Sequence, residues 1–532
     1  MFHQLVTPVG GSLLWSCLVA SIPIVTVLVL LGVFRRPAWQ ASSAGLAAAL
    51  VLAISVWDLP ADNAFSSVFA GGTFALVPVM WIVFNALVLY NVTVVSGRFQ
   101  NFRDWMLDHL PNDRRVVLVV VGFCFGCLLE GVAGFGTPVA ITSALLIALG
   151  FPALEALVFT LIFNTAPVAF GALGAPVTTL GAVTQLSDTA LGAMIGRQLP
   201  FIALLLPFYA VALYGGRRAI AGVWPVLLIA GASFATGQFI TSNYLGYALT
   251  DVISSAFSLI VTIAFLKLWR SKPDPQFALA AKQVATTSCA GEPAAGWIPW
   301  IILALTVVLW IHLRVNLAGR VTVHWPRLHE EVFITVYDKP YAANWTFQPL
   351  GTGTAILSAT VLTAFVVGLK PRQVSVVLLS SLAQIRLPAL TTTLIIGLAY
   401  LMNYSGMTYT LGVGAASAGM LFPLLSAFLG WLAVSLSGSD TSGNALFGNL
   451  QVVAARQLDL NPVLMAATNS SGGVFGKMIS PQNISTGTST TELRGKEGDV
   501  FARTFKHSLI LTFLLGLLVM LQQYVFPWMI PS

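Results

Sequence analysis

The chain has 532 residues, of which 57% are hydrophobic and only 8% are charged. Soluble domains average roughly 45–50% apolar and about 25% charged residues, so this composition indicates a polytopic membrane protein. It argues against a soluble enzyme, a nucleic-acid-binding protein and a disordered scaffold. The net charge of +7 does not imply a nucleic-acid partner, because the basic residues lie in short loops between apolar runs.

Apolar runs long enough to cross a bilayer recur along the whole chain, since about 20 such residues suffice. The first run is not a cleaved signal peptide, because no basic residue precedes it and Arg35-Arg36 follows it. The simple runs lie near 11–34, 38–57, 65–95, 199–214, 224–243, 248–268, 297–314, 352–369, 387–406 and 508–528.

Two further regions, 116–176 and 418–483, are apolar but crowded with Gly, Ser, Thr, Asn and Pro. We interpret each as a re-entrant hairpin followed by an interrupted span. The sequence therefore predicts an all-α polytopic membrane fold with about twelve crossings and two re-entrant hairpins.

The basic residues support this topology. With both termini outside, 19 of the 26 Lys and Arg residues fall inside, six fall outside, and Lys477 stays within the membrane. This is the positive-inside bias of membrane proteins. Treating either hairpin as a full span would invert everything after it and remove the bias.

The loops and the cysteines indicate less about function than the apolar runs do. Residues 270–296 form a polar inner loop, and residues 316–350 form an outer loop in which the alternation at 332–337 predicts a small hairpin, either a lid or a passive connector. The four cysteines are Cys17, Cys124, Cys127 and Cys289. Cys124-x-x-Cys127 lies inside an apolar run without a nearby His, which favours two buried small residues over a metal or redox pair.

An internal repeat marks the two polar regions. Asn164 to Pro176 and Asn469 to Pro481 both read Asn-x5-Phe-Gly-x4-Pro, 305 residues apart. Each follows a glycine-rich segment, at 130–138 and 437–444. In the predicted topology the two hairpins enter from opposite sides, which gives the inverted repeat with broken helices that many secondary transporters share.

This repeat divides the chain into three parts. Residues 1–222 form the first half, with its hairpin at about 116–150 and its broken span at about 152–195. Residues 223–296 add a helix pair and the inner loop. Residues 297–532 form the second half, with its hairpin at about 418–457 and its broken span at about 462–483.

Breaks of this kind suit an anion site. In hydrocarbon every backbone N–H and C=O needs a partner, so a break is tolerated only where it is buried or lines a wet cavity. Thr137-Pro138 and Ser480-Pro481 have the pattern of an N-cap followed by Pro, and Thr441, Ser442 and Asn444 can cap the return arm of the second hairpin. Helix N-termini bind anions. The alternative is that Gly and Pro only kink and pack the helices.

Few ionisable residues fall inside these segments, and three of them stand out: Glu130 at the first hairpin tip, Asp440 at the second, and Lys477 in the second break. A charge at bilayer depth is costly, so such residues are functional candidates. Glu130 and Asp440 are candidates for the coupling ion, and Lys477 for neutralising Asp440 or binding a substrate carboxylate. The alternatives are a structural Asp440–Lys477 pair and a Glu130 that reaches water. Asp251, at a span end, is a weaker candidate.

The sequence lacks the motifs that several kinds of chemistry require. The sequence has no Gly-x4-Gly-Lys-[Ser/Thr] phosphate-binding loop and no His/Cys cluster for a metal or haem. No cofactor or metal is therefore expected. Transport must be driven by an ion gradient or by the concentration gradient of the substrate itself. A membrane enzyme is disfavoured because no nucleophile–base pair is apparent.

Four segments together resemble the bacterial L-lactate permease family, and the likeness covers most of the chain. They are Glu130-Gly-Val-Ala-Gly-Phe-Gly-Thr-Pro-Val-Ala, Asn164-Thr-Ala-Pro-Val-Ala-Phe-Gly, the segment from Ser437 to Gln451, and the segment from Asn469 to Asn483. The resemblance implies a proton-coupled importer of lactate and related 2-hydroxymonocarboxylates such as glycolate, spanning the lipid of the bacterial inner membrane. It also implies two hairpins and two broken helices, elevator-type movement and homodimers. The outer loop 316–350 matches this family least.

On this interpretation Glu130 or Asp440 carries the proton, and one proton per lactate keeps the cycle electroneutral. The expected substrate-binding residues are Gly136, Thr137, Asn164, Thr165, Ser439, Thr441, Ser442, Asn444, Asn469, Ser470, Ser471 and Lys477. Two rivals stay open: a Na⁺-coupled carboxylate symporter, because paired Asn, Ser and Thr oxygens also suit Na⁺, and an ion channel or membrane-embedded signalling protein.

Overall fold

A computed structural model describes residues 1–34, 36–132, 136–271, 274–279, 293–489, 491–493 and 496–531. Cys289 lies outside these residues, as does the side chain of Thr137. Most of the described chain is helical, which confirms the predicted all-α membrane fold.

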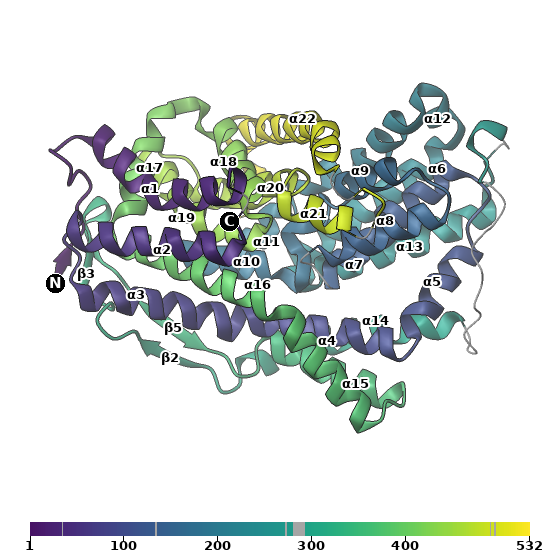
Figure 1. The fold of residues 1–532 in the computed structure, drawn as a ribbon, viewed down its shortest axis with the longest axis horizontal. Helices are drawn as coiled ribbons and strands as arrows, with labels where there is room; N and C mark the ends of the chain where they lie inside the picture. Colours follow the sequence, from purple (N-terminus) through teal and green to yellow (C-terminus); the bar gives the residue numbers. More distant parts are fainter. Residues whose placement is uncertain are drawn as a thin grey trace.

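The first helices form one side of the molecule, where α2, α3 and α4 run beside the later helix α16 (Figure 1). A π-helical turn at Pro78 interrupts the long third span, because proline cannot donate to the helical ladder. The elements are α1 (Leu13–Gly32), α2 (Ala38–Ser55), α3 (Ala61–Phe74), η1 (Ala75–Met80), α4 (Trp81–Val95) and α5 (Arg98–Asp108).

The first polar region folds as a helical hairpin followed by a bent helix pair. One hairpin arm runs over 114–132 and the other is α8, and α9 meets the segment 168–184 at a bend of 63°. The elements are α6 (Arg114–Val117), η2 (Leu118–Phe125), α7 (Gly126–Val132), α8 (Thr137–Ala148), α9 (Ala153–Phe163), η3 (Val168–Phe170), α10 (Gly171–Thr184) and α11 (Asp188–Ile195).

The next spans pack behind this region. Helix α12 is non-helical at Gly215 and Gly216, and a Cβ at Gly231 would lie 2.6 Å from the Leu204 carbonyl oxygen. Its two halves therefore fold back on each other, as the two predicted runs 199–214 and 224–243 require. The elements are α12 (Leu199–Ile240), η4 (Thr241–Leu245), η5 (Tyr247–Leu249), α13 (Thr250–Leu268), η6 (Pro275–Phe277), η7 (Pro293–Trp297), α14 (Ile298–His312) and η8 (Val315–Leu317).

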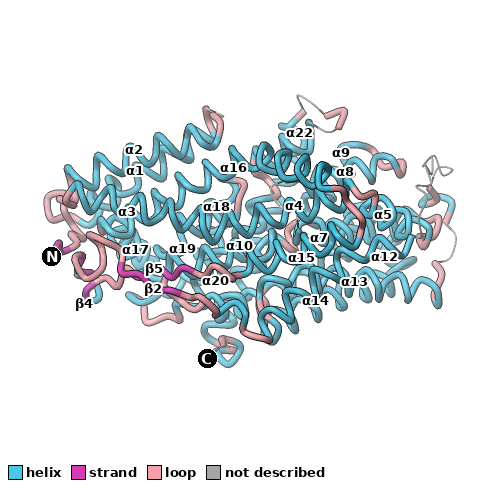
Figure 2. The backbone as a smooth tube through the Cα atoms, turned by 90° about the horizontal axis from the view of Figure 1, so that it is seen from below, coloured by secondary structure: helices cyan, strands magenta, loops and turns pink. Residues whose placement is uncertain are grey.

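The outer loop contains the predicted small hairpin. Strands β3 and β4 pair antiparallel, β2 pairs with β5, and the N-terminal strand β1 joins β3 in parallel. Figure 2 shows the N-terminus and these strands at the same end of the molecule, as expected if both lie outside. The strands are β1 (Phe2–His3), β2 (Val321–His324), β3 (Val332–Ile334), β4 (Lys339–Pro340) and β5 (Asn344–Phe347), and η9 (Thr335–Tyr337) follows β3.

The second polar region repeats the hairpin. Helices α18 and α19 pack together through a turn at Gly438 and Ser439, and α20 inserts against both. The elements are α15 (Thr352–Val366), α16 (Pro371–Ser405), α17 (Met407–Ala415), η10 (Ala416–Leu421), α18 (Phe422–Ser437), α19 (Asp440–Gln457), α20 (Pro462–Lys477), α21 (Pro481–Ser489), α22 (Glu497–Tyr524) and η11 (Pro527–Met529).

Polar and apolar side chains are distributed as in a membrane protein. Large apolar residues such as Phe69 and Phe365 are exposed on outer helix faces, while most Ser, Thr and Asn residues of both polar regions are buried. Ten helices within the described ranges are long and apolar enough to span a bilayer, or eleven when the bent pair is counted. The chain is thus a multi-pass membrane protein, and the predicted number of twelve crossings stays a prediction.

Candidate functional site

Glu130 is the centre of the charged site. Its side chain lies on α7 and is 2% exposed. One carboxylate oxygen accepts a hydrogen bond from Asn164 Nδ2 at 3.0 Å, and the other forms an ion pair with Lys477 Nζ at 2.5 Å. The first hairpin, the first break and the end of α20 therefore meet at one carboxylate.

Glycines make room for this carboxylate. A Cβ at Gly171 would lie 3.0 Å from Glu130 Oε1, and a Cβ at Gly131 would lie 2.7 Å from the Cβ of Asp251. Larger side chains at these two positions would push the helices apart. The glycine-rich composition near Glu130 thus has a packing reason as well as a conformational one.

The first break is a strained turn. The chain leaves α9 at Asn164 and passes Pro167, and its backbone then adopts left-handed dihedral angles at Ala172, Leu173 and Gly174. Left-handed dihedrals cost a residue with a Cβ about 1–2 kcal/mol, so the surrounding packing must hold Ala172 and Leu173 in place. Strain of this kind is common where a backbone is shaped for function.

The second hairpin begins its return arm with a true N-cap. Ser439 Oγ accepts a hydrogen bond from the Ser442 backbone N–H, which places Asp440 in the first turn of α19. The expectation that Thr441, Ser442 and Asn444 cap this arm is wrong, because all three lie inside the helix. Likewise Thr137 is the first residue of α8, and Gly136, with φ of 82°, occupies the cap position.

Asp440 is held by neutral donors rather than by a lysine. Its Oδ2 accepts from Ser470 Oγ at 2.5 Å and from Asn444 Nδ2 at 3.2 Å. Its Oδ1 is buried and has no hydrogen-bond partner within the described residues. The alternative of a structural Asp440–Lys477 pair is therefore wrong, because Lys477 binds Glu130.

The Asn469 motif lies within an intact helix, which differs from its counterpart in the first half. Asn469 Nδ2 donates to Asn444 Oδ1 at 2.9 Å, and Asn469 Oδ1 accepts from Gln451 Nε2 at 2.7 Å. Helix α20 continues to Lys477, and the break follows at 478–480. There Ser480 Oγ accepts from the Asn483 backbone N–H and caps α21, as the Ser-Pro pattern predicts.

The two halves contact each other crosswise. Glu130 of the first hairpin binds Lys477 at the end of α20, and Asn444 of the second hairpin donates to the Pro176 carbonyl in the first bent helix. Helix α20 also packs directly on η3 and α10. The two broken regions therefore lie together in the interior, as expected.

Not every expected residue takes part in these contacts. The Thr165 hydroxyl donates to the Ile162 carbonyl of its own helix, and Gly136 packs against Thr486. Thr441 is buried beside Asp440, and Ser471 Oγ is buried without a partner in the described part of the chain. The side chain of Thr137 lies outside the described residues.

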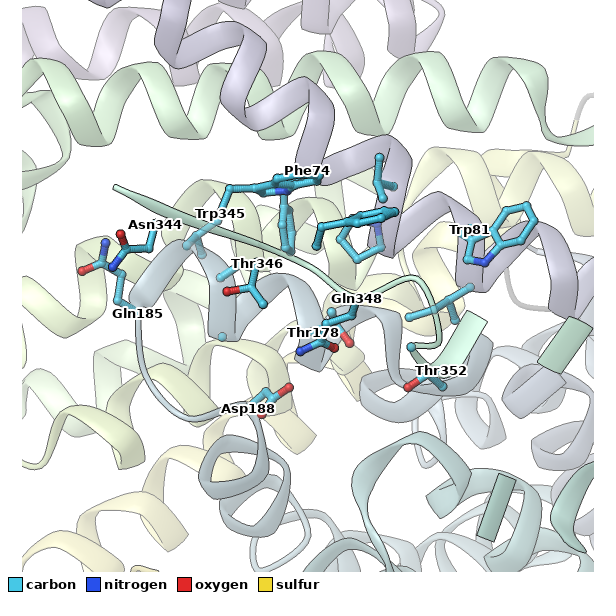
Figure 3. Close-up of a pocket in the computed structure, with 18 of the residues that line it drawn as sticks. Phe74, Trp81, Thr178, Gln185, Asp188, Asn344, Trp345, Thr346, Gln348 and Thr352 are labelled. Carbon is cyan, nitrogen blue, oxygen red and sulfur yellow. The ribbon is translucent and has the colours of Figure 1, made fainter. Parts of the chain in front are cut away.

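A cavity of about 1000 Å³ lies between the predicted outer loop and the first bent helix pair (Figure 3). The outer-loop segment 341–349 forms one wall, and residues of η1, α10, α11 and α16 form the others. Burial raises the pKa of Tyr341 in this wall well above its usual range, so its phenol stays neutral. None of the expected site residues lines the cavity, but the outer loop does.

One wall of the cavity lies close to the charged site. Tyr247 lines the cavity and bonds to Thr178 of α10 and to Asp188, at 3.1 and 2.8 Å. A Cβ at Gly174 would lie 2.6 Å from the Tyr247 ring, while Gly171, three residues earlier, packs on Glu130. One turn of the strained break therefore separates the cavity wall from the ion pair.

Asp251 is the residue that sequence reasoning undervalued. It lies in the first turn of α13, is 1% exposed, and neither carboxylate oxygen has a hydrogen-bond partner among the residues that the structure describes. We expected it at a span end. The usable signal was an acidic residue inside the apolar run 248–268, but the contact with Gly131 cannot be derived from the sequence.

Within the described ranges, no group of three or more His, Cys, Asp or Glu residues could hold a metal ion. Cys124 and Cys127 are buried and free. The site therefore offers carboxylates, one lysine and neutral amide and hydroxyl groups.

Comparison with known proteins shows similarity to lactate and glycolate permeases along most of the chain. Residues 16–526 match the sequence profile of the L-lactate permease family. The chain is 40% identical to the glycolate permease GlcA of Escherichia coli K12, over 99% of each chain, and 39% identical to an L-lactate permease of Bacillus subtilis 168, over 99% of each. The solved YdaH transporter of Alcanivorax borkumensis is 15% identical, with a TM-score of 0.45 over 86% of this chain and 87% of that one.

Proposed function

The chain belongs to the L-lactate permease family, and from this premise we propose that it imports lactate and related 2-hydroxymonocarboxylates such as glycolate together with protons. It is a permease rather than an enzyme, and its many apolar spans fit the bacterial inner membrane. The functions of its relatives, lactate and glycolate permeases at 39–40% identity, support this substrate class.

The buried Glu130–Lys477 pair is the observation that carries the proposal. A lysine that leaves its carboxylate partner can bind the carboxylate of lactate instead. Glu130 would then be a buried charge without a cation, which is costly, so it takes up a proton. The empty carrier holds Glu130⁻ with Lys477⁺, and the loaded carrier holds protonated Glu130 with lactate⁻ on Lys477⁺. Both forms are neutral in total.

Neutral groups around the pair would bind the rest of the substrate. Asn164 already touches Glu130, and Asn444, Asn469 and Ser470 form one hydrogen-bonded cluster beside Asp440. Ser471 Oγ and Asp440 Oδ1 are buried without partners within the described residues, so they are available for a 2-hydroxyl group. Asp440 is the second candidate for the proton.

The inverted repeat is part of this proposal. Equivalent asparagines support it, because Asn164 of the first half donates to Glu130 of its own hairpin and Asn469 of the second half donates to Asn444 of its own hairpin. The halves would be 1–222 and 297–532, each entering the membrane with a re-entrant hairpin from opposite sides. Two hairpins and two broken helices then enclose a site near the bilayer midplane.

The test is uptake of labelled lactate by proteoliposomes that hold the purified protein. An imposed pH gradient without Na⁺ should drive accumulation, and unlabelled glycolate should compete. The rival is a Na⁺-coupled symporter, because the clustered Asn and Ser oxygens also suit Na⁺. Uptake that requires Na⁺ and ignores the pH gradient would establish the rival and remove the proton mechanism.

A further inference from the structure

We propose that Asp251 is a proton-relay residue, which takes a proton from the outer cavity and passes it to Glu130. This inference rests on the proposed function, because it names the route of the coupled proton. It concerns a carboxyl group that the ion pair and the Asn–Ser cluster do not use.

Asp251 differs in its surroundings from the two buried carboxylates of the site, Glu130 and Asp440. Glu130 has a lysine and an asparagine, and Asp440 has a serine and an asparagine. Asp251 has no cation in contact and no donor to either oxygen among the residues that the structure describes. A buried carboxylate without a partner is strongly disfavoured, so burial favours the protonated form of Asp251.

Its position connects the cavity with the charged pair. Tyr247, one helical turn earlier, lines the cavity and bonds to Thr178 and Asp188. On the other side, the Cβ of Asp251 packs on Gly131, the residue after Glu130, where helices α7 and α13 are in direct contact. Asp251 therefore follows the cavity-lining Tyr247 by one turn and packs against the residue next to Glu130.

The ionisable groups that act on Asp251 come from two neighbouring helices: Glu130 and Cys127 on α7, and Lys477 on α20. While Lys477 neutralises Glu130, the proton stays on Asp251. When the substrate carboxylate takes Lys477, Glu130 becomes the stronger base, and the proton moves from the Asp251 carboxyl to the Glu130 carboxylate. Water in the cavity then returns one proton to Asp251, so the step balances with one proton taken from outside.

The experiment compares two transport modes of Asp251→Asn in proteoliposomes. Exchange of labelled for unlabelled lactate needs no net proton movement, whereas pH-gradient-driven uptake does. We expect Asp251→Asn to keep exchange within about twofold and to lose at least about tenfold of the driven rate, as for loss of a general acid–base group. Asp251→Glu should restore driven uptake. The matched control is Thr262→Val on the same helix, a polar side chain that is also fully buried; both of its rates should match wild type.

The outcomes separate the two claims. Driven uptake by Asp251→Asn at the wild-type rate would overturn the relay and leave the proposed function intact. Loss of both modes without rescue by Asp251→Glu would make Asp251 a packing residue and also overturn the relay. Wild-type protein that accumulates lactate only with Na⁺ would remove the proposed function itself.

Discussion

Lys477 and Glu130 form a buried ion pair across 347 residues of sequence, joining the end of α20 to the first hairpin. The lysine is 5% exposed and the glutamate 2%. Two charges removed from water are stable only together, so the pair connects the two polar regions. Whatever separates the pair must supply a new anion for the lysine and a proton for the carboxylate.

The first prediction concerns the stability of this pair. Lys477→Met leaves Glu130 buried without its cation, and we expect a loss of about 3–5 kcal/mol. The double variant Glu130→Gln, Lys477→Met should regain most of that loss, because no charge stays unpaired. Thermal unfolding of the purified protein in detergent measures both. Equal stability of the single and double variants would contradict the pair's burial.

The second prediction concerns coupling. Glu130→Gln cannot take up a proton, so it should retain lactate exchange and lose accumulation driven by a pH gradient. Asp440→Asn is the matched comparison, because Asp440 is equally buried but bound by Ser470 and Asn444. Measuring both modes at several pH values identifies the carrier. Unchanged driven uptake in both variants would exclude either residue as the proton site.

The third prediction concerns the neutral cluster. Asn444 donates to Asp440, Ser470 and the Pro176 carbonyl, and it accepts from Asn469. Asn444→Ala removes these bonds and leaves several buried groups unsatisfied, at about 1–3 kcal/mol for each. We expect reduced thermal stability together with a higher KM for lactate. A variant with normal stability and normal KM would show that the cluster is not part of the site.

Much of this architecture was readable from the sequence, for physical reasons. Apolar runs of span length identified the helices, and Glu130, Asp440 and Lys477 stood out because charges within apolar segments are rare. The Gly-Pro-rich stretches marked the hairpins and the first break. These signals are local, so they locate elements and candidate residues without placing them relative to one another.

The contacts between these buried side chains could not be predicted from the sequence, because they depend on packing between helices that are distant in the chain. Lys477 lies much closer in sequence to Asp440 than to Glu130, yet it binds Glu130. Asp251 lies at a span end, as predicted, but its packing against Gly131 of α7 could not be predicted. The second break falls at 478–480, directly before the predicted helix start at Ser480-Pro481. Asn469 lies earlier, inside the intact α20, and its amide donates to Asn444 of α19, a contact that the sequence does not show.

The fourth prediction concerns the close packing of α18 and α20. A Cβ at Gly430 would lie 2.0 Å from the Asn469 carbonyl oxygen. Gly430→Ala must therefore separate the helices, and overpacking of this kind costs about 1–3 kcal/mol. Gly498→Ala is the control, because a Cβ there meets nothing within 4 Å; we expect equal or higher stability. Thermal unfolding of both variants in detergent checks this, and a neutral Gly430→Ala would contradict the packing.

The last prediction tests the outer position of the cavity. Thr346 lies in the loop wall, and Arg218, on the predicted inner side, has a side chain that is 71% exposed. In a background with Cys17 and Cys289 replaced by serine, Thr346→Cys should react with a membrane-impermeant thiol reagent added to intact cells. Lactate should change the rate of this labelling reaction. Arg218→Cys should react only after the membrane is opened, while the buried Cys124 and Cys127 stay unreactive. Labelling of Arg218→Cys from outside would show that the predicted topology is inverted. The proton would then enter from the opposite side.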